Sequence, residues 1–249
     1  MKDRDVGCLK CGRKETIRAH LIPKVFCREV QVGKMHAAGV VGSNKFTPTQ
    51  SGIFDKHILC AKCDGELGDL ENYAAKKFRV IRSNFKNSKL GVHEMLSADS
   101  NKILRFAAGI LWKYSIAAKD FGQIDLLGFD DEIKKYAYGE IEKPSFLDGC
   151  FFWLRLNEGS SDLFAYRAPI MMSIDGVNTF KFLLGGMLFF IKVDDKDLLL
   201  PQFKDLLLGN SLGIRFLLAP ALLSEEFQEA RKLAFSQGSL SDFLDKNGS

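Results

Sequence analysis

Apolar residues that recur every three or four positions predict two long helices and one short one. The first helix begins near Gly65, and its apolar stripe consists of Leu67, Leu70, Ala74, Phe78 and Ile81. The second covers residues 101–120, with Asp99, Ser100 or Asn101 as its N-cap and with Ile103, Ala107, Ile110, Leu111 and Tyr114 facing inward. A short helix at residues 224–235 is expected to close the chain.

Strand patterns lie on both sides of these helices. The runs at residues 150–157, 163–174 and 180–193 are aromatic and aliphatic and are bounded by turn residues, which predicts a meander of antiparallel strands. Residues 32–52 are rich in Gly, Ser, Thr and Pro, which indicates a long loop or hairpin, and residues 53–59 read as a short strand. The fold class expected is therefore α+β.

Composition and charge describe an ordinary globular chain with two unequal parts. Of its 249 residues, 46% are hydrophobic and 27% are charged. The longest apolar runs, 182–191 and 216–223, are about half the ~20 residues that cross a bilayer, so no membrane partner is expected. The first residues, MKDRDVG, lack the apolar region of a signal peptide, which favours a cytoplasmic location.

The net charge changes sign along the chain. Residues 1–95 hold 18 Lys and Arg against 10 Asp and Glu, a charge of +8, whereas residues 96–249 hold 17 against 21, a charge of −4; the two add to the total of +4. The sequence between residues 84 and 100 is polar. We therefore expect a domain at residues 1–95 and an α+β partner-binding or sensor domain at 96–249.

The basic excess is concentrated after the first helix begins, because no acid occurs from Asn72 to His93. Such a stripe suits a phosphate backbone, although a solvated helix face has the same composition. The residues expected to bind nucleic acid are Lys76, Lys77, Arg79 and Arg82, and the stripe continues with Lys86 and Lys89.

Four of the six cysteines form two C-x-x-C pairs, Cys8 with Cys11 and Cys60 with Cys63. Two such turns can close a tetrahedral structural Zn²⁺ site, and a redox dithiol is the alternative. Cys27 and Cys150 fit buried, small apolar positions. Between the pairs stands His20, which can be a metal ligand, a packed core residue or a catalytic base.

These motifs together resemble one known family. A C-x-x-C pair, then His20-Leu21-Ile22-Pro23, then Leu59-Cys60-x-x-Cys63 and a helix is similar to the zinc-containing HNH endonucleases with their ββα-metal fold. The resemblance covers residues 8–85. It implies that His20 is the general base, that Asp55 orients it, and that Asp64 lies near a catalytic divalent ion. The family often carries a metal ligand directly before the base, where this chain has Ala19.

Two functions follow from these observations. In the first, the chain is a metal-dependent endonuclease, with structural Zn²⁺ and a catalytic Mg²⁺ or Mn²⁺ held by Asp64 and by Glu71, which is two helical turns further on. Nucleic acid, with DNA favoured over RNA, is the substrate, and the C-terminal domain binds a protein partner or a signal. In the second, the chain is a non-catalytic zinc module that binds nucleic acid or protein. Asp64 is then explained by the helix dipole and Glu71 by solvation.

Overall fold

A six-stranded mixed sheet forms the largest element of the fold in the computed structural model, which describes residues 7–29, 36–39, 46–49, 52–155, 166–197, 201–210, 212–225 and 228. β10 and β6 run parallel, and the other neighbouring strands run antiparallel. The strand order is β5 (Gly91–Met95), β10 (Ile214–Pro220), β6 (Leu147–Arg155), β9 (Met187–Val193), β8 (Val177–Leu184) and β7 (Tyr166–Ile174).

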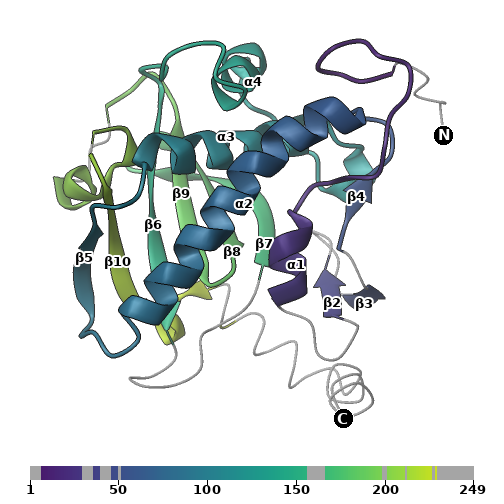
Figure 1. Cartoon of the computed structure of the whole chain (residues 1–249). Helices are drawn as coiled ribbons and strands as arrows, with labels where there is room; N and C mark the ends of the chain where they lie inside the picture. Colours follow the sequence, from purple (N-terminus) through teal and green to yellow (C-terminus); the bar gives the residue numbers. More distant parts are fainter. Residues whose placement is uncertain are drawn as a thin grey trace.

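Two long helices, α2 (Ala61–Asn84) and α3 (Ser100–Ile116), cover one face of this sheet (Figure 1). Every residue of the predicted stripes of both helices is buried, so this prediction is confirmed. α2 begins four residues before Gly65 because its N-cap is Cys60, inside the second C-x-x-C pair. α3 has the predicted cap Asp99, whose side chain accepts a hydrogen bond from the backbone of Lys102.

The predicted aromatic runs are strands, with one difference. The run at 180–193 is two strands, β8 and β9, which pair antiparallel across Gly185 and Gly186. Both glycines have positive φ, +56° and +79°, as a tight hairpin turn requires. The two glycines therefore divide what reads in the sequence as one long apolar segment.

The segment between the cysteine pairs contains the predicted hairpin. β2 (His36–Gly39) pairs antiparallel with β3 (Phe46–Thr49). A second small pair joins β1 (Ala19–His20) to β4 (Phe54–Asp55), so only two residues of the predicted strand 53–59 are in a strand. α1 (Lys24–Glu29) follows β1, and the short α4 (Asp130–Ala137) follows α3. The predicted closing helix lies mostly outside the described residues, of which it includes only 224, 225 and 228.

The hydrophobic core continues across residue 95. Phe78 of α2 lies at its centre, with ring contacts to Phe26 of α1, Phe106 of α3, Phe151 of β6 and Phe189 of β9 at centroid distances of 5.5–6.3 Å. A separate domain has its own core. The predicted division into 1–95 and 96–249 therefore does not divide the described core. In the part of the chain that is described, no helix is both long and apolar enough to cross a membrane.

Candidate metal centre and the neighbouring Lys113 cluster

The four cysteines of the two C-x-x-C pairs meet in one place. The sulfur atoms of Cys8, Cys11, Cys60 and Cys63 all lie within 4.8 Å of one another, and Cys11 Sγ is 3.7 Å from Cys60 Sγ. In a tetrahedral site with Zn–S bonds of ~2.3 Å, two sulfurs are about 3.8 Å apart. This cysteine cluster is therefore placed to hold one tetrahedral metal ion.

The first C-x-x-C pair is a tight turn fixed by backbone hydrogen bonds. Gly12 N donates to Cys8 O and Cys8 N donates to Arg13 O, both at 2.7 Å. Gly12 has φ +74°, which a residue with a side chain rarely adopts. Leu9 N donates to Ile58 O at 2.8 Å, which holds this turn beside the second pair.

The second pair begins a helix, and this position favours a thiolate at Cys60, whereas burial and the neighbouring cysteines raise the pKa of Cys63. Cys60 is the N-cap of α2, so the positive end of the helix dipole faces the sulfurs. The backbone N–H of Cys63 stabilises the Cys60 thiolate and lowers the pKa of this thiol to about 7, although burial opposes the shift. A thiolate is the form that binds a metal ion.

The cysteine cluster also contacts the region after α3. The Tyr138 hydroxyl donates to Cys63 O at 3.1 Å, and the Tyr138 ring packs edge-to-face on Trp112 of α3. Lys10, between the first two cysteines, lies 4.8 Å from the centroid of the same tyrosine ring and forms an ion pair with Glu140. The metal centre is thus joined to the core of the protein on two sides.

The two remaining cysteines are buried, as their sequence positions predict. Burial raises the pKa of Cys27 and of Cys150 to about 12. Such thiols stay protonated near neutral pH and are poor metal ligands.

His20 lies in strand β1 of the small β1–β4 pair, at the boundary between the surface and the interior. Its side chain is half-buried, its Nε2 atom has no contact with solvent, and its ring lies 5.9 Å from the ring of Phe54 on the opposite strand. His20 does not belong to the cysteine cluster. Of the three roles considered for His20, the metal ligand is therefore not found.

Asp55 is not placed to orient His20. In the β1–β4 pair Asp55 is opposite Ala19 and Phe54 is opposite His20, so the side chains of Asp55 and His20 leave the pair on opposite faces. The buried Asp55 carboxylate accepts hydrogen bonds from His57 N at 2.9 Å and from Ala118 N at 3.0 Å. This corrects the predicted role, because Asp55 fixes its own turn and the end of α3.

Glu71 is paired with a lysine that sequence patterns did not single out. Lys113 of α3 is only 1% exposed, and its Nζ atom lies 2.6 Å from Glu71 Oε1 and 2.6 Å from the main-chain oxygen of His20. On a helix, one Lys at an inward position has no distinguishing pattern. Only the pairing of Glu71 with a spatial neighbour 42 residues away could have indicated it.

Asp64 belongs to the same group. Burial raises the pKa of the Asp64 carboxyl, the positive charge of Lys113 partly offsets the rise, and the charge of Glu71 adds to it. We call Lys113, Glu71, Asp64 and the main chain of His20 the Lys113 cluster. The sequence analysis singled out His20, Asp64 and Glu71 but not Lys113, the cation that pairs with Glu71 and with the main chain of His20.

The Lys113 cluster does not fit the predicted divalent ion. Mg²⁺ needs carboxylate oxygens, and here Glu71 Oε1 is bound by an ammonium group. A dication and an ammonium 4 Å apart repel each other by about 8 kcal/mol at an effective dielectric constant of 20. Glu71 therefore serves as the counter-ion of Lys113 in this structure rather than as a ligand of a catalytic ion.

The predicted basic stripe on α2 is mostly occupied by contacts within the protein. Arg82 is 5% exposed, and it donates to Gly185 O and to Glu29, which also binds Arg79. The Lys77 ammonium donates to Ser97 O. Arg82 is therefore an interior residue, which corrects its predicted role, and Lys76 is left as an exposed member with no contact described.

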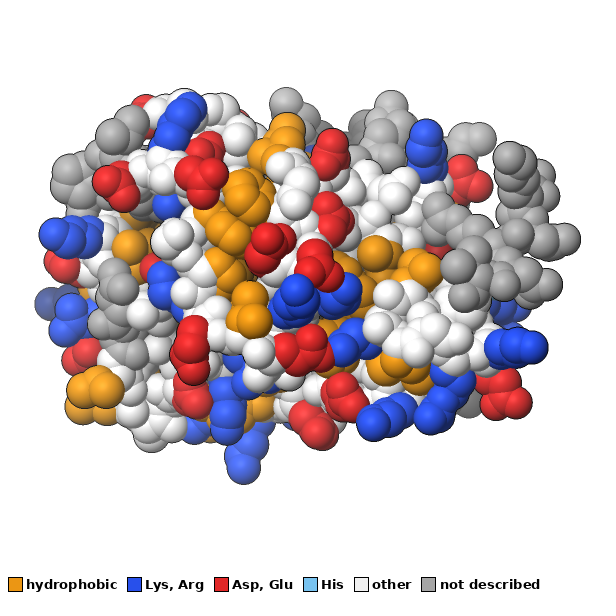
Figure 2. Space-filling view, turned by 90° about the horizontal axis from the view of Figure 1, so that it is seen from above, with side chains coloured by type: hydrophobic (Ala, Val, Ile, Leu, Met, Phe, Trp, Pro, Cys, Tyr) orange, Lys and Arg blue, Asp and Glu red, His pale blue; other side chains and the backbone are white. Residues whose placement is uncertain are grey.

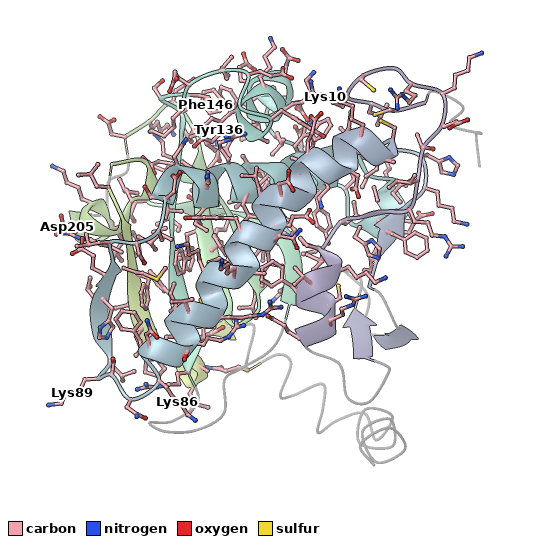
Figure 3. All side chains as sticks on the ribbon, viewed as in Figure 1. Lys10, Lys86, Lys89, Tyr136, Phe146 and Asp205 are labelled. Atoms are coloured by element: carbon pink, nitrogen blue, oxygen red, sulfur yellow. The ribbon has the colours of Figure 1, made fainter. Side chains whose placement is uncertain are left out.

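The remaining lysines of the stripe are far from the metal centre. A 24-residue helix is roughly 36 Å long, and Lys86 and Lys89 follow its C-terminal end. Figure 3 shows both at the end of the molecule opposite Lys10, which stands beside the sulfur atoms. These lysines are therefore remote from the metal centre.

A different set of basic side chains lies near His20. Arg18, Lys24, Arg28 and Lys56 are all exposed. Arg18 precedes β1 and covers the Phe54 ring at 5.3 Å, and Thr16 holds the backbone of Lys56 beside it. We call these four residues the β1–α1 basic surface. Figure 2, a view from above, shows basic and acidic side chains mixed across the centre of this face, with Lys and Arg more frequent than Asp and Glu toward the lower right edge.

Comparison with known proteins adds no relative: the chain matches no family model, no curated protein and no solved structure.

Proposed function

We propose that this protein is a zinc-containing endonuclease of the HNH type that hydrolyses phosphodiester bonds of nucleic acid, with DNA favoured over RNA. The observation that carries the proposal is the position of His20. Strand β1 pairs with strand β4, helix α2 follows β4, and the cysteine cluster joins the turn before β1 to the start of α2. The main-chain oxygen of His20 contacts Lys113, which also pairs with Glu71.

Zinc has a structural part in this proposal. All four ligands are cysteines, so no coordination position is left for a substrate or water. When bound, the ion would hold the turn at Cys8 against the first turn of α2. It would thereby fix the loop that leads to His20.

In the proposed chemical step His20 acts as the general base. A ring nitrogen takes a proton from water, the water oxygen forms a bond to phosphorus, and the bond from phosphorus to the leaving oxygen breaks with its electron pair. The leaving oxygen then gains a proton, so the products are a phosphomonoester and a free hydroxyl group. General base catalysis of this kind contributes typically ~10² to 10⁴ in rate.

The β1–α1 basic surface would hold the phosphate backbone. Lys24 and Arg28 are four residues apart on α1 and share one face, and Arg18 and Lys56 flank the β1–β4 pair that carries His20. Exposed cations next to the base place a phosphate near the reacting group. The C-terminal part of the chain, residues 96–249, would bind a protein partner or a signal.

The experiment is cleavage of supercoiled plasmid, linear DNA and RNA by the zinc-loaded protein, with and without added Mg²⁺ or Mn²⁺. Nicking or linearisation that depends on the protein and is absent in a His20→Ala preparation of equal zinc content supports the proposal. Zinc-loaded, folded protein that cuts no substrate contradicts it.

A non-catalytic zinc module is the second candidate. Two observations favour it: the Nε2 atom of His20 is buried, and Glu71 is already neutralised by Lys113. On this account His20 is a packed histidine, and the β1–α1 basic surface binds nucleic acid without cutting it. Binding with no cleavage, and loss of stability in His20→Ala, would support this candidate.

A further inference from the structure

The side chain of Lys113 occupies an unusual position for a lysine. It points into the interior from the last turn of α3, between Trp112 and Tyr114, and is 1% exposed. Lysine is almost never fully buried unless its charge is paired. Here its ammonium group makes two short contacts, one with an acid of α2 and one with the main chain of β1.

These two contacts are the kind that a bound cation makes. A carboxylate oxygen of Glu71 and a carbonyl oxygen of His20 both face the ammonium group at 2.6 Å. Carboxylate and carbonyl oxygens are also the ligands of hard divalent cations. The oxygen atoms around Lys113 thus form a cation site whose occupant is covalently attached to the chain.

We propose that Lys113 takes the place of a divalent cation: its ammonium group holds Glu71 and the backbone of His20 in position and excludes Mg²⁺ or Mn²⁺ from this site. Lys113 is a positioning residue, since it acts through His20 and Glu71. The exclusion of metal does not depend on the proposed function. The catalytic consequence rests on the proposed function. It is that cleavage at His20 needs no added divalent ion.

The test measures Mn²⁺ binding to the full-length, zinc-loaded protein by electron paramagnetic resonance. Lys113→Met keeps the length of the side chain and removes its charge, which leaves the Glu71 carboxylate without its counter-ion. We expect this variant to bind one Mn²⁺ with a dissociation constant at least about tenfold below that of the wild type. The double variant Lys113→Met, Glu71→Gln should lose most of this gain.

Lys102→Met is the matched control, because it removes an exposed lysine from the same helix. It should bind Mn²⁺ as the wild type does. A folded Lys113→Met variant without improved binding would overturn the proposal. If Lys113→Met does not fold, Mn²⁺ binding to the wild type tests the proposal instead. A tight Mn²⁺ site in the wild type that disappears in Glu71→Gln would show that Lys113 does not exclude the ion.

Cleavage measurements separate this proposal from the endonuclease proposal. Wild-type cleavage in buffer freed of divalent ions, at unchanged zinc content, is the expected result. Cleavage that requires added Mg²⁺ would overturn the role of Lys113 and leave the endonuclease standing. Absence of cleavage in every condition would end the endonuclease proposal, while the Mn²⁺ experiment would still test Lys113.

Discussion

Tyr138 donates a hydrogen bond from its hydroxyl group to the main-chain oxygen of Cys63, 3.1 Å away. This contact links the metal centre to the segment after α4, 75 residues later in the chain. It satisfies a carbonyl group in the first turn of α2 and leaves the sulfur free for a metal ion. The metal centre is therefore supported by residues far from it in sequence.

Tyr138→Phe should lower both the stability and the zinc retention of the protein. The lost hydrogen bond is worth about 1 kcal/mol of unfolding free energy. Zinc should also leave faster when a chelator is added, because Cys63 loses its support. Urea unfolding and a colorimetric chelator assay measure the two effects.

Tyr136→Phe is the comparison for this prediction. Tyr136 donates to Asn101 rather than to the metal centre, so its variant should lose a similar stability and keep zinc as the wild type does. Equal zinc release from the two variants would contradict the supporting role of Tyr138.

Asp55→Ala should destabilise the fold without a specific effect on the chemistry at His20. The substitution leaves the N–H groups of His57 and Ala118 without their acceptor, at a cost of roughly 1–3 kcal/mol. Thermal unfolding measures this loss. Any cleavage per folded molecule should stay close to that of the wild type, and a fall as large as that of His20→Ala would show that Asp55 orients His20.

The sequence predicted those parts of the fold that are encoded locally. The periodic stripe of α2 contains Phe78, and the pattern placed it inward without showing that it contacts four other elements. β5 and β10 were missed because they pair with one another across more than a hundred residues of the sequence, which no local pattern shows. α4 is only eight residues long, too short for a periodic pattern to be distinctive.

The candidate site was predicted in a similarly uneven way. The spacing of the cysteines is enough to predict a shared metal site, because two C-x-x-C turns have few other uses. Lys113 could not be predicted, since its burial depends on the packing of α3 against both α2 and β1. The basic stripe was predicted as a surface only in part: Arg82 is buried and binds Glu29, an acid outside the stripe, whereas Arg79 also binds Glu29 but stays exposed.

Replacement of any cysteine of the cluster by Ser should remove zinc and unfold the region around it. A structural zinc site contributes ~10 to 16 kcal/mol of apparent binding free energy in zinc-finger peptides, more than a domain can lose. Metal analysis and circular dichroism measure the result. Cys27→Ala and Cys150→Ala are the controls, and both should retain about one zinc per chain; full zinc content in Cys60→Ser would contradict the metal centre.

The salt dependence of nucleic-acid binding should identify the surface that holds the backbone. A variant in which Gln replaces Arg18, Lys24 and Lys56 should bind duplex DNA with a weaker salt dependence. The slope of log binding constant against log salt concentration should fall in magnitude by about 2.7, because each phosphate contact contributes ~0.9. Fluorescence anisotropy at several salt concentrations measures the slope. A second variant, in which Gln replaces Lys76, Lys86 and Lys89, loses the same charge. Its salt slope should match that of the wild type. The reverse result would return the interface to the stripe on α2.

The most direct measurement of the central claim is the plasmid-nicking rate of His20→Ala against His57→Ala, at equal zinc content and equal thermal stability. His57 is an exposed histidine two residues beyond β4, so its loss controls for the removal of an imidazole from the same region. Hydrolysis with His20 as the base predicts a rate lower by a factor of ~10² to 10⁴ in His20→Ala and an unchanged rate in His57→Ala. Equal rates in His20→Ala and the wild type, or no nicking by a folded and zinc-loaded wild type, would contradict the claim.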